Sequence, residues 1–444
     1  HFSLSRGVFH MVTSTAIPQA RFKLTTNQKR GFLAAWGGWA LDGMDAFIYA
    51  LVLVSALTEL LPRSGIEVNQ ANIGYYGSIL GALFLLGWGL SMVWGPIGDR
   101  IGRVRALMLT ILCYSLFTFM CGLVTNIWQL AILRVLCGIG IGGEQPIGAT
   151  YIAEELDERT RKIGAGLMHT GYYFGFFFAS LANNFIGANY GWRVMFIFGG
   201  LPALTIAFIR YGVHESTKWQ ERFGDGKQER PTMAQAFGKL FTPRYQRDTL
   251  MMSGLFLVSI VMLWAGSILV PTAANQMATA AGSTPADANL SGTYSGYVLA
   301  LGTIIGCVLV PFVAESLGRR LSMAIFLTIM GISAAVGFGY VFYQPGALAL
   351  FFVCVFFMGL GGANFANYTI WLPELYTTDC RASAIGFISS VGRFAGVGMT
   401  FLVAWGIREY GSLGVPVAVL AMTFVFGLAL LPFTKETKGH VLPA

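Results

Sequence analysis

The sequence predicts an all-α membrane protein in which twelve transmembrane helices form two pseudo-symmetric six-helix bundles. The first observation is composition: 55% of the 444 residues are hydrophobic and only 11% are charged, whereas a soluble domain carries about 25% charged residues. The second is that apolar stretches of about 20 residues, long enough to span a bilayer, recur along the chain. The third is that motifs of the first half return in the second. The net charge of +8 does not indicate nucleic-acid binding, because the basic residues lie between the apolar stretches.

Each apolar stretch is assigned one span. In the first half we expect spans at 31–58, 72–95, 106–125, 128–152, 162–186 and 191–213. In the second half we expect them at 249–274, 291–314, 321–343, 347–371, 383–405 and 412–433. The charged segment 214–248 is the expected cytoplasmic linker between an N-terminal bundle at 31–213 and a C-terminal bundle at 249–433. Residues 1–30 and 434–444 are the expected cytoplasmic tails.

The distribution of Lys and Arg predicts the orientation. Basic residues gather in both tails, the linker and the even-numbered connections, while the opposite face has only Arg63, Arg193 and Arg408. Both termini are therefore expected in the cytoplasm and the protein in the (inner) cell membrane. We expect no cleavable signal peptide. Residues 1–10 precede Met11 and are either a tag remnant or an upstream start, so no part of the fold is assigned to them. The six cysteines lack metal-ligand spacing, so no metal, cofactor or disulfide is expected.

One charged stretch between the second and third spans stands out. Gly95-Pro-Ile-Gly-Asp99-Arg100-Ile-Gly-Arg103-Val-Arg105 packs four charges into seven residues, so it must lie in water at a membrane face, with glycines that allow a tight reversal. The pattern resembles the signature loop of the major facilitator superfamily, a family of secondary transporters, and implies the major facilitator fold. A weaker copy, Glu315-Ser-Leu-Gly-Arg319, follows 216 positions later, which argues against a generic positive turn.

A second pair of residues repeats at nearly the same distance. Glu154 and Arg161 return as Glu374 and Arg381, 220 positions later. Two repeated motifs indicate a duplicated six-helix unit. In transporters built from such repeats, the substrate site lies near the membrane midplane between the repeats.

The resemblance further implies a charge lock on the cytoplasmic side. Asp99 would face the positive N-terminal end of the eleventh helix, near residues 382–384, and the neighbouring arginines would pair with Glu154 or Glu155. The alternative is that these charges only anchor the loops. The candidate gating residues are Asp99, Arg100, Arg103, Glu154, Arg161, Glu315, Arg319, Glu374 and Arg381.

Few ionisable residues lie inside the spans, where each costs at least about 2.5–3.5 kcal/mol and is rarely idle. With a rise of about 1.5 Å per residue, Asp45 and Arg134 lie at one depth, about 21 Å from the inner edge. An Asp facing an Arg suits proton coupling, because the Arg favours the ionised form and burial the neutral one. Arg134-x-x-x-Gly138 resembles a family motif whose Arg partners a first-span Asp. The candidate proton-coupling residues are Asp42, Asp45, Arg134 and Glu144.

Three alternatives remain open for these residues. Either Asp42 or Asp45 carries the proton. The Asp–Arg contact could instead be a static ion pair that holds the bundle together. Glu144 is a second protonation site or a structural hydrogen-bonding residue.

Arg393 in the eleventh span has no obvious acidic partner in its own half. An unpaired membrane Arg suits an anionic ligand, since guanidinium binds carboxylate bidentately; the alternative is pairing with Asp42. Aromatic and polar residues could line the cavity around it, although aromatic side chains in membrane helices often pack or lie at the interface. The candidate substrate-binding residues are Arg393, Tyr49, His169, Tyr172, Tyr173, Trp264, Tyr297, Asn364, Asn367 and Tyr368.

Further motifs resemble one branch of the family. Gly140-x-Gly142-Gly143-Glu144, Trp192-Arg193, His214–Trp219 and Pro373–Arg381 are similar to the metabolite–proton symporters, which include carriers of aromatic and other organic acids. Asp42-Gly-Met-Asp45 is similar to the first-span motif of aromatic-acid symporters. The resemblance implies a monomeric importer of a small organic anion with protons.

Three other functions are the alternatives. A proton-antiporting exporter of drugs or organic ions fits a cavity Arg less well when the ligand is a cation. A sugar–proton symporter lacks support, because 253–270 is nearly all apolar and has no pair of glutamines. The third is a non-transporting membrane sensor. No nucleophile–base set or cofactor loop suggests an enzyme.

Overall fold

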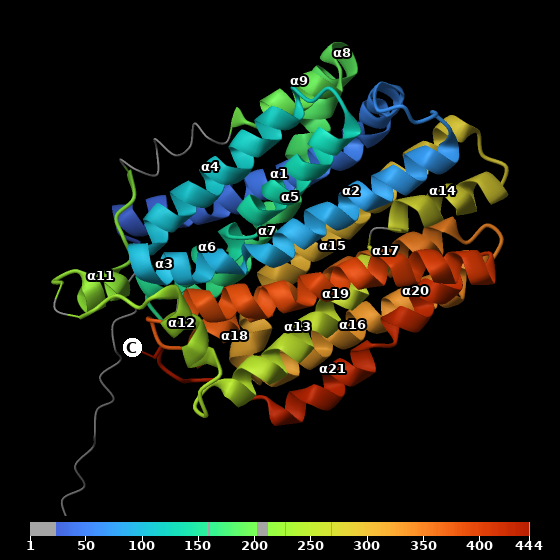
Figure 1. Ribbon diagram of the computed structural model, residues 1–444. Helices are drawn as coiled ribbons and strands as arrows, with labels where there is room; N and C mark the ends of the chain where they lie inside the picture. The colour runs from blue at the N-terminus through green and yellow to red at the C-terminus, as the bar shows by residue number, and fades with distance from the viewer. Residues whose placement is uncertain (1–23, 159, 202–211, 227, 268, 444) are drawn as a thin grey trace, which may run out of the picture.

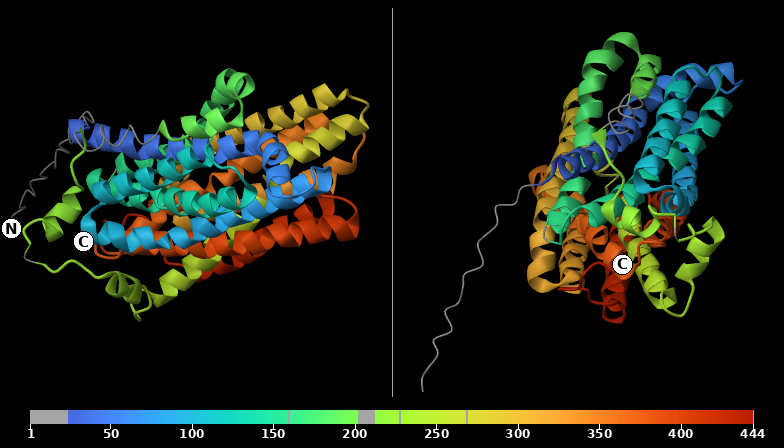
Figure 2. Two further views of the ribbon diagram at one scale, coloured as in Figure 1. Left: turned by 45° about the horizontal axis from the view of Figure 1, so that its top comes forward. Right: turned by 90° about the vertical axis from the view of Figure 1, so that its left-hand side faces the viewer.

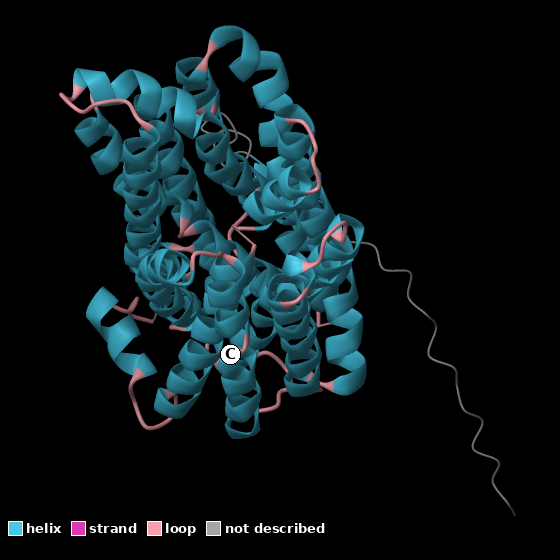
Figure 3. Cartoon of the chain, turned by 90° about the vertical axis from the view of Figure 1, so that its right-hand side faces the viewer, coloured by secondary structure: helices cyan, strands magenta, loops and turns pink. Residues whose placement is uncertain are grey.

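The computed structural model describes residues 24–443 apart from 159, 202–211, 227 and 268. Within these residues the chain forms helices joined by turns and loops, and no strand (Figure 3). The all-α class predicted from composition is confirmed. Most of the predicted N-terminal tail lies outside the described residues.

The helices follow one another in three groups. The first half contains α1 (Thr26–Arg63), α2 (Gln70–Leu90), α3 (Trp94–Ile101), α4 (Arg103–Cys121), α5 (Ile127–Ile141), α6 (Glu144–Glu155), α7 (Thr160–Ala182), α8 (Ala188–Tyr190) and α9 (Trp192–Phe198). The connecting segment contains α11 (Thr217–Phe223) and α12 (Met233–Leu240). The second half contains α13 (Gln246–Gly266), α14 (Val270–Ala280), α15 (Pro285–Leu317), α16 (Arg319–Gly339), α17 (Leu348–Gly362), α18 (Asn364–Leu375), α19 (Arg381–Tyr410), α20 (Gly414–Ala421) and α21 (Phe424–Leu430).

Several long helices begin at a side chain that accepts from a free backbone N–H. Thr25 and Gln28 form a capping box at the start of α1, with distances of 3.2 Å from Gln28 N to Thr25 Oγ1 and 3.0 Å from Thr25 N to Gln28 Oε1. Asn69, Asn126 and Thr284 cap α2, α5 and α15 with their side-chain oxygens. These polar side chains satisfy N–H groups that the first turn leaves free, and so favour a helix start at these positions.

Two mirrored glycines make the tight reversals of the repeated motif. Gly102, between α3 and α4, has φ +104°, and Gly318, between α15 and α16, has φ +93°. L side chains rarely adopt such angles, so glycine is needed at both turns. Asp99 and Arg100 lie in the last turn of α3 rather than in the loop suggested by the motif, because the reversal is confined to Gly102.

Ten helical segments of the described chain are long and apolar enough to cross a membrane. Two predicted spans are not among them. One is 162–186, which corresponds to α7, a helix with Arg161 and Lys162 in its first turn. The other is 191–213, of which only the beginning and the end lie within the described residues.

Some spans are interrupted. The fourth consists of α5 and α6, which meet at Gly142-Gly143, and the tenth consists of α17 and α18, which meet at Ala363. The predicted seventh span at 249–274 is interrupted near its end, because α13 ends at Gly266 and α14 begins at Val270. Pro271 in the first turn of α14 has no N–H and would clash with the preceding turn of a continuous helix.

Each half has its own hydrophobic core. The halves meet where α7 packs against α15 and α18, and where α2 and α3 pack against α19 (Figure 1). Ala382 of α19 belongs to the first core and Ala149 of α6 to the second, so the halves interlock at one end. The start of α1, α11 and the C-terminus lie together at one end of the bundle (Figure 2). We call this end the terminal face.

Candidate functional site

Asp99 joins the two halves at the terminal face. Its buried carboxylate accepts hydrogen bonds from the backbone N–H of Ala382 (3.3 Å) and Ser383 (2.9 Å) and from the Ser383 hydroxyl (2.6 Å). These groups form the N-terminal end of α19, where free N–H groups and the helix dipole favour an anion. A Cβ built at Gly95 would come within 2.6 Å of Ala382 O, so this approach of α3 to α19 needs glycine.

A second contact between the halves centres on Glu154. Its carboxylate accepts from Arg103 Nε (2.9 Å) and Nη2 (2.8 Å) in the first half and from Arg381 Nη1 (2.6 Å) in the second. Ser216 Oγ donates to the same carboxylate at 2.6 Å. All four side chains are buried, and Arg103 also donates to the Thr378 carbonyl across the interface (2.7 Å). The pairing expected for Glu154 is therefore present.

The second half repeats this arrangement. Glu374 accepts from Arg319 Nε (2.9 Å) and Nη2 (2.8 Å), and from Arg161 Nη2 (3.0 Å) across the interface. Thr437 Oγ1 donates to Glu374 at 2.6 Å, in the position that Ser216 has at Glu154. Glu315 pairs with Lys162 of the first half at 3.0 Å. We call Asp99, Glu154, Glu374 and their partners the terminal lock.

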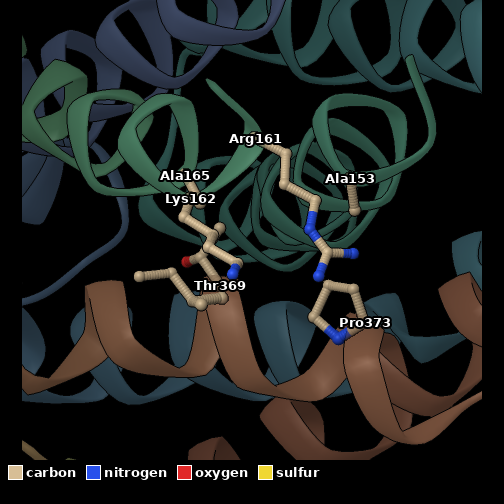
Figure 4. Close-up of a pocket in the computed structure, with 7 residues that line it drawn as sticks. Ala153, Arg161, Lys162, Ala165, Thr369 and Pro373 are labelled. Carbon is tan, nitrogen blue, oxygen red and sulfur yellow. The ribbon is translucent and has the colours of Figure 1, made fainter. Parts of the chain in front are cut away.

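Figure 4 shows how α7 reaches the second half within the terminal lock. Arg161 extends from α7 toward Pro373 of α18, and Lys162 lies beside Thr369 of the same helix, around a small cavity. Arg100 is not part of this network: its side chain is exposed, and the ion pairs of the motif are made by Arg103 instead. The gating role of these residues stays a prediction.

We expect Glu154→Gln to open the terminal face. Breaking a buried ion pair costs about 3–5 kcal/mol, so the state with joined halves loses stability relative to an open one. Cys380, buried beside Arg381, serves as the reporter: in a protein without the other cysteines, its rate of maleimide labelling should rise at least about tenfold. Arg100→Gln is the matched control and should leave the rate unchanged. Equal rates in Glu154→Gln and the parent would contradict the lock.

Two glutamates that the sequence reasoning did not single out hold the starts of α4 and α16. Glu215 accepts from the backbone N–H of Arg103 (2.8 Å) and Val104 (3.2 Å), and Glu436 accepts from that of Arg319 (2.9 Å) and Arg320 (3.0 Å). The sequence contains a signal for both residues, because each glutamate directly precedes a hydroxyl residue, Ser216 or Thr437, that donates to a carboxylate of the terminal lock.

The pKa values of the two glutamates are shifted in opposite directions. Burial raises the pKa of Glu215, although backbone N–H groups and the nearby Arg103 act in the opposite direction. Burial alone would also raise the pKa of Glu436, but four backbone N–H groups, those of Arg320, Arg319, Lys438 and Thr437, outweigh it and lower that pKa. The folded state therefore favours neutral Glu215 and ionised Glu436.

These directions predict opposite pH dependences. The pKa of Glu215 is raised in the folded state, so this residue lowers the free energy of unfolding as the pH rises above 4.5, the ordinary pKa of glutamate. The pKa of Glu436 is lowered, so this residue increases the free energy of unfolding as the pH rises toward 4.5 and keeps that contribution above it. At pH 7 the melting temperature should therefore fall more in Glu436→Gln than in Glu215→Gln, and at pH 4 the two variants should differ less. Thermal unfolding of both at the two pH values checks this. A larger loss in Glu215→Gln at pH 7 would contradict the assignment.

Four ionisable side chains of the first half lie at membrane depth, all at most 1% exposed: Asp42, Asp45, Arg134 and Glu144. Among the described residues none of the four forms an ion pair, and both carboxylate oxygens of Asp42 and of Asp45 have no hydrogen-bond partner. The expectation that Asp45 and Arg134 meet directly is wrong for this conformation. The Arg134 guanidinium lies instead over the rings of Tyr49 (3.8 Å) and Phe84 (4.1 Å), which attract a cation to their faces.

Glu144 is held more firmly than the two aspartates. Its Oε2 lies 2.7 Å from Thr110 Oγ1, while Oε1 has no partner. Thr110 Oγ1 also lies 2.8 Å from the Leu107 carbonyl. Because a hydroxyl has a single proton, Thr110 must share it between the Leu107 carbonyl and an ionised Glu144, whereas a protonated Glu144 can donate to Thr110 Oγ1 in return.

Arg393 of α19 lies between the halves. Its Nη2 donates to Gln145 Oε1 of α6 (2.7 Å), and its Cζ lies 4.5 Å from the centre of the Trp88 ring of α2. The side chain is only 4% exposed, and its Nη1 has no partner. The alternative of direct pairing with Asp42 is not seen within the described part of the chain. The sequence does not identify Gln145 and Trp88 as neighbours of Arg393, because they lie on α6 and α2 and only the packing of these helices against α19 brings them together.

Aromatic rings surround Arg393. Of the predicted residues, His169 stacks on Phe365 across the halves (6.2 Å, 10°), and Tyr172 lies between Trp39 (5.1 Å) and Trp88 (6.4 Å). Tyr368 belongs to the same cluster through Phe256, whose ring centre lies 6.0 Å from Arg393 Cζ.

The remaining predicted lining residues lie at the edge of this cluster or outside it. Half-buried Tyr173 of α7 adjoins the cluster, its ring centre 5.8 Å from that of Tyr172, and Tyr297 stacks on Phe177 (5.6 Å) where α15 meets α7. Asn364 and Asn367 donate to the carbonyls of Gly361 and Arg319 within the second half, while Tyr49 supports Arg134. The side chain of Trp264 lies outside the described part of the structure.

Comparison with known proteins identifies the fold. The structure matches that of the proton:xylose symporter XylE from E. coli, with a TM-score of 0.72, 20% sequence identity and coverage of 94% of this chain and 98% of that one. The Major Facilitator fold, with its two six-helix bundles, is thereby confirmed.

The similar sequences are transporters. A "probable 4-methylmuconolactone transporter" of Cupriavidus pinatubonensis is 29% identical over 426 residues, 93% of this chain and 91% of the relative. A "cis,cis-muconate transport protein" of Acinetobacter baylyi is 25% identical over 419 residues, 92% of this chain and 95% of the relative. The protein is therefore a multi-pass membrane transporter rather than an enzyme. A family model matches residues 35–400, and the chain belongs to the Major Facilitator Superfamily.

Proposed function

We propose that this transporter is a proton-coupled symporter that imports a small organic anion bearing a carboxylate. The observation that carries the proposal is Arg393, a buried cation between the halves whose hydrogen-bonding partner is the neutral Gln145 and whose Nη1 has none. A buried charge without a direct ion-pair partner is costly, and a carboxylate can meet a guanidinium with two parallel hydrogen bonds. The relatives named for muconate and 4-methylmuconolactone support a small organic acid as the substrate.

Transport would proceed by alternating access. The terminal lock joins the halves at one end through Asp99, Glu154 and Glu374, each of which binds a partner in the other half. Separation of these contacts would open the terminal face while the rest of each half moves as a packed unit. Since basic residues concentrate at this face, we assign it to the cytoplasm and the protein to the inner membrane of the cell.

The proton would be carried by the first half. Asp42 and Asp45 have unpaired carboxylate oxygens, with Arg393 close enough to act electrostatically on the first and Arg134 on the second. Moving one charge across 100 mV is worth about 2.3 kcal/mol, so a proton taken up with the anion removes the opposition of the membrane potential. Glu144 is a second protonation site in this scheme, because a protonated Glu144 can donate to Thr110 Oγ1 and leave the hydroxyl proton to the Leu107 carbonyl.

The test uses the purified full chain in proteoliposomes with cis,cis-muconate and benzoate as probes. An inward proton gradient should drive accumulation of at least one probe above its outside concentration, and a protonophore should abolish it. Empty liposomes are the control. Gradient-driven export of the probe would favour the antiporter alternative and overturn the proposal, as would binding without any flux.

A further inference from the structure

Two tryptophans of the aromatic cluster around Arg393 have indole N–H groups without a partner: Trp88, which lies against the guanidinium, and Trp39, which packs on the same Tyr172 ring as Trp88. Trp39 of α1 is 3% exposed and Trp88 of α2 is 6% exposed, and neither Nε1 finds an acceptor among the described residues. A buried N–H without a partner costs about 1–3 kcal/mol. The same is true of Arg393 Nη1, so three buried donors in one cluster lack an acceptor.

Unpaired indole N–H groups are not typical of the other buried or half-buried tryptophans whose side chains the structure describes. All five of these donate to an acceptor: Trp36 to Thr170, Trp94 to the Ile139 carbonyl, Trp192 to Glu59, Trp219 to the Asp99 carbonyl and Trp371 to the Lys435 carbonyl. The fold thus satisfies indole N–H groups elsewhere. The two exceptions belong to the aromatic cluster around Arg393, where the proposed function places the substrate.

The exceptions belong to one continuous set of rings. Trp88 lies against the guanidinium of Arg393 (4.5 Å), and both Trp88 and Trp39 pack on Tyr172. Trp39 also lies 5.8 Å from His169, which stacks on Phe365 of the second half. These rings therefore form one aromatic surface that begins at the guanidinium and includes both tryptophans, and such a surface suits a flat, unsaturated molecule.

We infer that the substrate is a flat, unsaturated acid with two recognised ends: a carboxylate at Arg393 and a second hydrogen-bond acceptor at the indole N–H groups of Trp88 and Trp39. The inference rests on the proposed function and names its substrate class more narrowly. A site with buried donors disfavours an analogue that leaves them unpaired. Acids without a second acceptor should therefore bind more weakly than acids that have one.

Matched probes test the second end. The purified chain is titrated with benzoate, with 4-formylbenzoate, which adds an acceptor but no donor, and with cyclohexanecarboxylate, which lacks the flat ring. Expected is a Kd for 4-formylbenzoate about 3–10-fold lower than for benzoate, and weakest binding of cyclohexanecarboxylate.

Matched variants assign the effect to the two indoles. Trp88→Phe and Trp39→Phe keep a ring and remove the N–H, so each should reduce the preference for 4-formylbenzoate over benzoate. Trp36→Phe, whose N–H is already used by Thr170, should keep the preference. Equal affinities for the two benzoates in the parent chain, or an unchanged preference in both variants, would overturn the inference while leaving the proposed function in place. Failure of all three acids to bind would overturn both.

Discussion

Replacement of Arg393 by glutamine is expected to weaken organic-anion binding by at least about 30-fold, since loss of one partner of a buried charge pair costs about 2–5 kcal/mol. Glutamine keeps polar atoms near Gln145 but carries no charge for a carboxylate. Because Arg393 is buried among Trp88, Phe256 and Gln145, few water molecules can compensate. The measurement is the Kd for benzoate of the purified variant.

Two further variants separate the charge of Arg393 from its shape. Arg393→Lys keeps the charge but loses the planar fork, and should give an intermediate affinity. Arg100→Gln removes an exposed arginine outside the cluster and should bind as the parent does. Parent-like affinity in Arg393→Gln would remove this residue from the site and with it the main support for an anionic substrate.

The second large effect is expected at the first-span aspartates. One of the two variants Asp45→Asn and Asp42→Asn, the one that replaces the proton carrier, should reduce proton-driven accumulation to an inside-to-outside ratio of about one. A permanently neutral side chain cannot carry the proton through the cycle. Exchange of labelled for unlabelled substrate should continue, since substrate binding rests on Arg393. Proteoliposomes with and without an imposed pH gradient separate the two activities.

The pair of variants also decides between the two carboxylates. Only the residue that carries the proton should uncouple accumulation from exchange; the other variant should retain accumulation. Glu144→Gln, on α6, is a third variant that keeps the Thr110 contact and tests whether the second protonation site is needed. Full accumulation in both aspartate variants would refute proton coupling through the first span.

The local pattern of residues determined the class of the protein and most of the terminal lock. Hydropathy alone indicates many helical spans, because the bilayer requires about 20 apolar residues for each. The stretch Asp99–Arg103 and the residue Glu154 are repeated in the second half. This repeat indicates that charged residues occupy equivalent positions in the two halves, at the same membrane face. These are local or periodic properties, and they do not depend on how the helices pack.

Inside the membrane, only the tertiary structure decided which polar groups meet. Equal depth predicted an Asp45–Arg134 pair, but depth says nothing about rotation around the helix axis, and Arg134 lies over Tyr49 and Phe84 instead. Arg393 meets Gln145, which is 248 positions away, and the unpaired N–H groups of Trp39 and Trp88 become evident only once all neighbours are placed. A sequence shows which residues are costly to bury, whereas the packing of distant helices decides which of them find a partner and which are left for a ligand.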